Sequence, residues 1–185
     1  MRPSTHPIPP QNDTAMTATE FLDAYHRHRQ ARAQLPPGPV EAFTVRGAEL
    51  HGVTFDQAID LSGAVFIDCR FRQCNFLQAD LFAVSADRAH FSECIFDAVN
   101  MNKSRLERAV FEGCWLRSAH FLRADLSGAL FRSGRLSVCD FRRAQLLDAE
   151  FHGCRVDDEC DFSDADLEGA LFSECGGFEP LSVVQ

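Results

Sequence analysis

Large apolar residues recur at every fifth position from Leu61 to Val156, and most of them are Phe or Leu. Only one member of this series, Ala86, is small, and a slim residue such as Ala, Cys or Val usually stands two positions before each member. A period of five fits neither a helix nor an extended strand. Two inward positions separated by one outward position instead suit a short extended segment followed by a turn. Because such a unit cannot bury its apolar face alone, successive units are expected to coil and stack as a solenoid.

The series slips by one residue near each end of the repeat. It continues N-terminally to Leu50 if Ala58 is an extra residue, and C-terminally to Phe172 if Glu159 is extra. With both slips, all 8 cysteines fall on the slim position. Cysteines stacked in one row would lie about 4.8 Å apart with parallel side chains, a geometry that disfavours disulfides. We therefore expect packed, reduced thiols and a reducing compartment, the cytoplasm.

Several units follow the pattern Ala-[Asp/Asn]-Leu-x-x or a close variant of it. They include Ala79-Asp80-Leu81, Ala124-Asp125-Leu126, Ala165-Asp166-Leu167 and Cys139-Asp140-Phe141. From about Ala48 to Phe172 the chain therefore resembles the pentapeptide-repeat proteins. The resemblance implies an all-β solenoid, a right-handed quadrilateral β-helix in which four units make one coil of about 20 residues.

Residues one coil apart should then stack in columns along the solenoid. One column would consist of the phenylalanines Phe71, Phe91, Phe111, Phe131, Phe151 and Phe172. The slim column of the next side would consist of Cys74, Cys94, Cys114, Gly134, Cys154 and Cys175. At a rise of about 4.8 Å per coil, roughly six coils give a rod near 30 Å long.

The N-terminal part of the chain lies outside the repeat. Residues 1–15 are rich in proline and are expected to be a disordered tail. Residues 16–46 predict one short α-helix, running to about Gln34, and a linker. The helix opens with the capping-box spacing Thr17-Ala18-Thr19-Glu20 and carries Phe21, Leu22 and Tyr25 on one face. We expect this segment to cap the solenoid, and a partner-binding helix is the alternative.

The solenoid itself is expected over residues 47–176, followed by a C-terminal tail over 177–185. This tail contains apolar residues but no helical signal. It either folds over the last coil or meets a second copy, which would give a homodimer through a solenoid end.

Neither the composition nor any motif of the sequence indicates catalysis or the binding of a cofactor, a metal or nucleic acid. The chain carries 27 acidic and 18 basic residues, a net charge of -9, which argues against direct nucleic-acid binding. No apolar run is long enough for a membrane span. The histidines show no ligand spacing, and no phosphate loop, nucleophile elbow or zinc motif is present. We therefore expect a protein that is not an enzyme, with no catalytic, cofactor-binding or metal-binding residues.

Outward charges give two candidate partner-binding features. The first is an acidic ladder along one side: Asp60, Asp80, Asn100, Asp140 and Asp161, with His120 in the same row. The second is a basic patch in the middle of the chain: Arg105, Arg108, Arg123, Arg142 and Arg143. The alternative for the ladder is that Asp or Asn at this position is the repeat consensus and satisfies turn amides.

The resemblance also implies a function. Some pentapeptide-repeat proteins mimic the shape and charge of DNA, bind type II topoisomerases such as DNA gyrase or topoisomerase IV, and confer quinolone resistance. The net charge and the ladder favour this hypothesis, whereas the basic middle of the chain weighs against it. The other hypothesis is a protein–protein interaction scaffold without a topoisomerase role. In both cases the expected partner is a protein.

Overall fold

The computed structural model describes residues 15–34, 41–57 and 59–177 of the chain. The expected disordered tail lies outside the described residues except for Ala15, and the expected C-terminal tail lies outside them except for Gly177.

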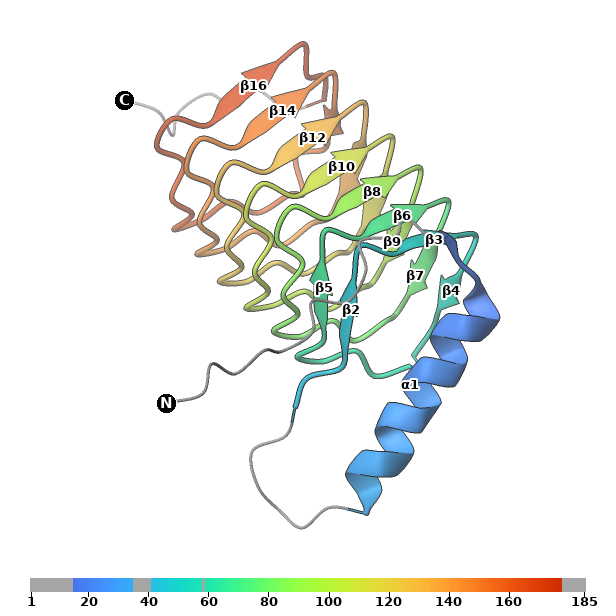
Figure 1. The fold of residues 1–185 in the computed structure, drawn as a ribbon. Helices are drawn as coiled ribbons and strands as arrows, with labels where there is room; N and C mark the ends of the chain where they lie inside the picture. Colours follow the sequence, from blue (N-terminus) through green and yellow to red (C-terminus); the bar gives the residue numbers. More distant parts are fainter. Residues whose placement is uncertain (1–14, 35–40, 58, 178–185) are drawn as a thin grey trace, which may run out of the picture.

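The described residues form a β-solenoid of about six turns with one short helix at its N-terminal end, which confirms the expected fold class (Figure 1). Most strands have three residues, because each strand crosses one side of a coil before the chain turns. The helix is α1 (Ala18–Ala33). The strands are β1 (Ala15–Met16), β2 (Thr44–Arg46), β3 (Glu49–His51), β4 (Thr54–Phe55), β5 (Val65–Ile67), β6 (Arg70–Arg72), β7 (Asn75–Leu77), β8 (His90–Ser92), β9 (Ile95–Asp97), β10 (Val110–Glu112), β11 (Trp115–Arg117), β12 (Leu130–Arg132), β13 (Arg135–Ser137), β14 (Glu150–His152), β15 (Arg155–Val156) and β16 (Leu171–Ser173).

The solenoid has four sides, each built by parallel pairing between successive coils. One side is an eight-stranded sheet in the order β1-β3-β6-β8-β10-β12-β14-β16. The next side along the chain is a six-stranded sheet in the order β4-β7-β9-β11-β13-β15. The aspartate side follows, where single bridges link the row from Asp60 to Asp161. The β5 side comes next, with the β2–β5 pair and bridges that continue to Asp166.

Strand register confirms both the 20-residue coil and the two slips. In the middle of the solenoid Phe91 pairs with Phe111, one coil of 20 residues later. At the N-terminal end Phe55 pairs with Phe76, and at the C-terminal end Phe151 pairs with Phe172, each 21 residues apart. Both slips in register therefore fall between the six-stranded sheet and the aspartate side.

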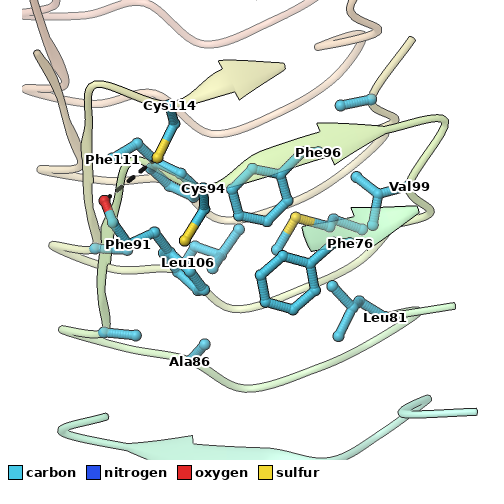
Figure 2. Close-up of a cluster of buried hydrophobic side chains, with 14 of the residues drawn as sticks. Phe76, Leu81, Ala86, Phe91, Cys94, Phe96, Val99, Leu106, Phe111 and Cys114 are labelled. Carbon is cyan, nitrogen blue, oxygen red and sulfur yellow. Dashed lines mark hydrogen bonds between the residues drawn. The ribbon is translucent and has the colours of Figure 1, made fainter. Parts of the chain in front are cut away.

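Stacked phenyl rings fill the interior, as the column pattern predicts. Along the eight-stranded sheet, neighbouring rings from Phe71 to Phe172 have centroids 4.4 to 5.0 Å apart and planes within 15° of parallel. A second stack includes Phe76 and Phe96 on the six-stranded sheet, at 4.8 Å (Figure 2). Except for Phe172, which is only partly buried at the C-terminal end, these rings are almost fully buried, so the centre of the coil is a continuous apolar core.

The cysteines occupy the slim inward position, and each buried thiol of the central column finds a carbonyl. The Cys94 Sγ donates to the Phe71 carbonyl oxygen at 3.3 Å. The Cys114 Sγ donates to the Phe91 carbonyl oxygen, also at 3.3 Å (Figure 2). The acceptor in each case belongs to the preceding coil. Cysteine therefore fits the space that alanine occupies elsewhere and adds a weak hydrogen bond between coils.

Helix α1 lies across the open end of the first coil (Figure 1). Its capping box forms as predicted, with the Thr17 Oγ1 accepting from the Glu20 N–H and the Glu20 carboxylate accepting from the Thr17 N–H. Phe21 is fully buried, with its ring centroid 5.2 Å from that of Phe55. The Tyr25 hydroxyl donates to the Asp60 carbonyl oxygen at 3.1 Å and accepts from the Asp60 N–H at 3.0 Å. The helix thus covers apolar surface and unpaired backbone that the first coil would otherwise expose.

The N-terminal boundaries differ from the expected ones by a few residues. The solenoid begins with β2 at Thr44 rather than at residue 47, because Val45 occupies the inward position and pairs with Phe66. Ala15 was expected in the tail, but it begins β1, which adds a strand to the eight-stranded sheet beside β3. A two-residue strand has too little pattern to be read from sequence.

Candidate interaction surfaces

Stacked rings and slim side chains fill the interior of the described solenoid, so the candidate sites lie on its outside. A hollow of about 570 Å³ lies between α1 and the first coil, and Tyr25, Arg29 and Asp60 are among its lining residues. There Arg29 donates to the Tyr25 hydroxyl at 3.0 Å, so its polar groups serve the attachment of the helix. Within the described residues, no group of three or more His, Cys, Asp or Glu side chains is placed to hold a metal ion. The helix that the structure describes is neither long nor apolar enough to cross a membrane.

The structure brings the members of the acidic ladder into one row on the aspartate side. The row reads Asp60, Asp80, Asn100, His120, Asp140 and Asp161. Except in His120, a side-chain Oδ1 accepts a hydrogen bond from the backbone N–H two residues later, at 2.9 to 3.2 Å. Each such side chain therefore satisfies a turn amide, as the alternative interpretation of the ladder proposes.

Neighbouring side chains neutralise part of this row. Arg142 donates from Nε and Nη2 to the two carboxylate oxygens of Asp140, both at 2.9 Å, and this contact lowers the pKa of Asp140. The Arg142 Nε also lies 3.7 Å from the Asp161 Oδ2. Asn100 donates its side-chain N–H to the Asp80 Oδ1 at 2.9 Å. The aspartate side is therefore not an uninterrupted line of free negative charge.

The five arginines of the candidate basic patch are spread over two sides. Arg123, Arg142 and Arg143 lie on or at the corner of the aspartate side, while Arg105 and Arg108 lie on the β5 side. Three of the five are in ion pairs: Arg105 with Asp87 at 2.9 Å, Arg142 with Asp140, and Arg143 with Asp164 at 3.4 Å. Within the described part of the chain, Arg108 and Arg123 make no ion pair. The candidate patch therefore holds less free positive charge than its sequence suggests.

Exposed apolar side chains gather on the six-stranded sheet, which the sequence analysis did not single out. Leu77 is 41% exposed, Ile95 is 43% exposed and Trp115 is 58% exposed, and all three point outward from this sheet. Val138, directly after β13, is 44% exposed at its corner. Four of the six large hydrophobic residues exposed in the described chain thus lie on this one side.

Arginines continue the same row toward the C-terminal end. In register across β9, β11, β13 and β15 lie Ile95, Trp115, Arg135 and Arg155, which we call the Trp115 stripe. The Arg135 guanidinium lies over the Trp115 ring, 5.2 Å from its centroid. Neither Arg135 nor Arg155 forms an ion pair with any residue that the structure describes. The outward phase of Trp115, one position before Leu116, is the sequence signal that could have located this stripe.

Thiol reactivity should report directly on the inward position of the cysteines. We expect an aromatic disulfide reagent at pH 8 to react quickly with Cys175, which is only partly buried, and slowly with the others. Burial raises the pKa of the Cys69 and Cys154 thiols to about 11, so little reactive thiolate is present at this pH. In denaturant all eight thiols should react.

The control is Cys175→Ser, which should remove the fast phase and leave the slow one. Several thiols reacting at the rate of Cys175 in native protein would contradict the buried arrangement.

A protein-family model matches within the part of the chain in which the five-residue repeat was found. Residues 64–141 match the family model described as a pentapeptide repeat region. No curated protein matches the sequence.

Three of the solved structures that are similar to this chain are QnrB1, HetL and Rfr23, and the last two are described as pentapeptide repeat proteins. Full-length QnrB1, a plasmid-mediated fluoroquinolone resistance protein, is 15% identical, with 71% of this chain and 92% of that chain covered and a TM-score of 0.46. HetL, involved in heterocyst differentiation regulation in the cyanobacterium Nostoc sp. strain PCC 7120, is 17% identical, with 86% and 94% covered and a TM-score of 0.35. Rfr23 from the cyanobacterium Cyanothece 51142 is 16% identical, with 85% and 99% covered and a TM-score of 0.39. Residues 64–141 of this chain are therefore a pentapeptide-repeat region, and its five-residue period and four-sided coil make the chain similar to the pentapeptide-repeat proteins.

Proposed function

We propose that the chain is a non-enzymatic interaction scaffold whose outward rows bind another protein. The observation that carries this proposal is the division between a filled interior and flat outer sides. The inward positions are occupied by stacked rings and slim residues, while exposed apolar side chains collect on the six-stranded sheet. Pentapeptide-repeat proteins are in general structural or interaction scaffolds. Exposed apolar clusters on a soluble domain commonly mark contacts with a protein partner.

Photo-crosslinking from each side tests this proposal. A benzophenone amino acid would be placed at one outward position per side: Ser92 on the eight-stranded sheet, Ser137 on the six-stranded sheet, Asn102 on the aspartate side and Ser127 on the β5 side. In cells, we expect one protein to be captured repeatedly from one side and not from the opposite side. Absence of any reproducible adduct from all four positions would contradict the scaffold proposal.

A second candidate function is the DNA mimic that binds DNA gyrase or topoisomerase IV. The observation that favours it is the acidity of the last coil, which contains acidic residues and no basic residue from Asp157 to Gly177. The contacts of Asp140 with Arg142 on the aspartate side weigh against it. If this function holds, purified protein shifts gyrase supercoiling or protects gyrase from a fluoroquinolone at micromolar concentration.

The matched variant for this assay neutralises three of the exposed acids of the last coil, with Asp158→Asn, Glu159→Gln and Glu168→Gln. It should lose the effect on gyrase if acidity mimics DNA. A wild-type protein without any effect on supercoiling or drug inhibition would end the topoisomerase hypothesis and leave the general scaffold proposal standing.

A further inference from the structure

The Trp115 stripe changes from apolar to cationic along the solenoid axis. We infer that it binds an amphipathic helix of a partner protein, laid lengthwise, with aliphatic side chains over Ile95 and Trp115 and carboxylates over Arg135 and Arg155. This inference rests on the scaffold proposal and names the side and the chemistry of the partner.

The apolar half of the stripe is a contact surface without a partner in the described chain. Ile95 and Trp115 are neighbours in register on β9 and β11, and both are more than two-fifths exposed. Leu77 adds a third exposed side chain on β7. Tryptophan at the centre of such a surface provides a large contact area at a small cost in side-chain entropy.

The cationic half of the stripe, Arg135 and Arg155, is suited to bind carboxylates of a partner. Asp97 on the same sheet is already in an ion pair with Arg117. Asp157 accepts a hydrogen bond from the Val138 N–H at 3.1 Å, so this carboxylate serves a turn. Within the described part of the chain, Arg135 and Arg155 therefore keep positive charge beside the tryptophan that no carboxylate pairs. A partner that covers the Trp115 ring and places carboxylates against the Arg135 and Arg155 guanidinium groups would bury the apolar half of the stripe and form ion pairs with its cationic half.

Spacing favours a helix over an added strand. The hydrogen-bonding edges of the six-stranded sheet lie at the two ends of the solenoid, so its face offers no backbone groups to an extended peptide. Successive rungs of the stripe rise by about 4.8 Å. Side chains on one face of a helix recur about every 5–6 Å. The three intervals from Ile95 to Arg155 therefore match about ten helical residues at 1.5 Å each.

Two other occupants fit the stripe less well. If a second copy bound by a two-fold axis through Trp115, Arg135 and Arg155 would face Ile95 and Asn75, which offer no carboxylate. Nucleic acid would meet a protein with a net charge of -9, and the aliphatic Leu77 and Ile95 offer it no stacking surface.

The single tryptophan of the chain makes the test direct, because its fluorescence reports only on this stripe. The probe is a labelled helical peptide with two leucines followed by two glutamates on one face. We expect saturable binding by anisotropy at micromolar concentration, with a blue shift of the Trp115 emission. Peptides with lysine in place of both glutamates, or serine in place of both leucines, should bind at least tenfold more weakly.

Two protein variants with the same charge change separate the stripe from general electrostatics. Arg135→Glu with Arg155→Glu should weaken peptide binding at least tenfold. Arg108→Glu with Arg123→Glu lies on other sides and should leave binding within about twofold. Trp115→Ala should weaken binding as measured by anisotropy. All of these side chains are outward, and circular dichroism checks that each variant is folded.

Four results would overturn the inference. They are no saturable shift with the leucine–glutamate peptide, equal weakening by the two arginine pairs, a shift produced by oligothymidine instead, or a shift that follows self-association of the protein without peptide. Crosslinks from Ser92, Asn102 or Ser127 without peptide binding would preserve the scaffold proposal and reject the stripe. Failure of both experiments would reject the two proposals together.

Discussion

Replacing Phe111 by alanine should lower the free energy of unfolding by about 3–5 kcal/mol. Phe111 is 1% exposed and stacks between Phe91 and Phe131, with ring centroids 5.0 and 4.8 Å away. Parallel strands hydrogen-bonded above and below hold these rings, so the coil cannot collapse to fill the space that the ring leaves. Urea unfolding followed by circular dichroism measures the loss.

The matched control is Phe82→Ala, which removes the same side chain from an outward position. Phe82 is 37% exposed and lies under Lys103, so its loss should change stability by less than about 1 kcal/mol. Equal effects of the two substitutions would contradict the inward stacking of the phenylalanine column.

Replacing Phe21 by alanine should destabilise the first coil by a comparable amount, about 3–5 kcal/mol. The Phe21 ring is fully buried, with centroids 5.2 Å from Phe55 and 5.5 Å from Phe43. Because each coil of a solenoid contacts mainly its neighbours, the loss should be local. Native-state hydrogen exchange should show reduced protection in β2 and β4, with little change in β10 and β12.

Arg27→Ala is the control for this prediction, since Arg27 is exposed on the outer face of α1 and alanine keeps the helix intact. It should leave exchange in β2 and β4 unchanged. If Phe21→Ala also left these strands fully protected, α1 would not stabilise the end of the solenoid.

Much of the fold could be predicted because each five-residue unit restricts the polarity and size of residues that are close together in the sequence. The inward pair of each unit must be apolar and of fixed size, so the phase of Phe111 and Cys114 already indicates that they face the core. The slips near Ala58 and Glu159 were visible for the same reason. Thr17 and Glu20 lie within one helical turn, so the capping box could also be predicted from the sequence.

The candidate sites were less predictable, because outward positions carry no such constraint. The sequence places Asp140 in a row of acids, but only the structure shows that Arg142 holds both of its carboxylate oxygens. It also shows Arg105 and Arg143 in ion pairs, whereas Arg135 and Arg155 have none with the residues that the structure describes.

The amino-acid sequence by itself determined the five-residue unit, the 20-residue coil and the buried columns, since each follows from contacts that repeat at a fixed spacing, and it determined the N-terminal helix through its capping box. Only the tertiary structure decided which charges are paired: Arg105 with Asp87 and Arg143 with Asp164, each about one coil away, whereas Arg135 and Arg155 make no ion pair within the described residues. Those residues are separated by whole coils, and whether their outward side chains meet a partner depends on packing between coils rather than on the repeat.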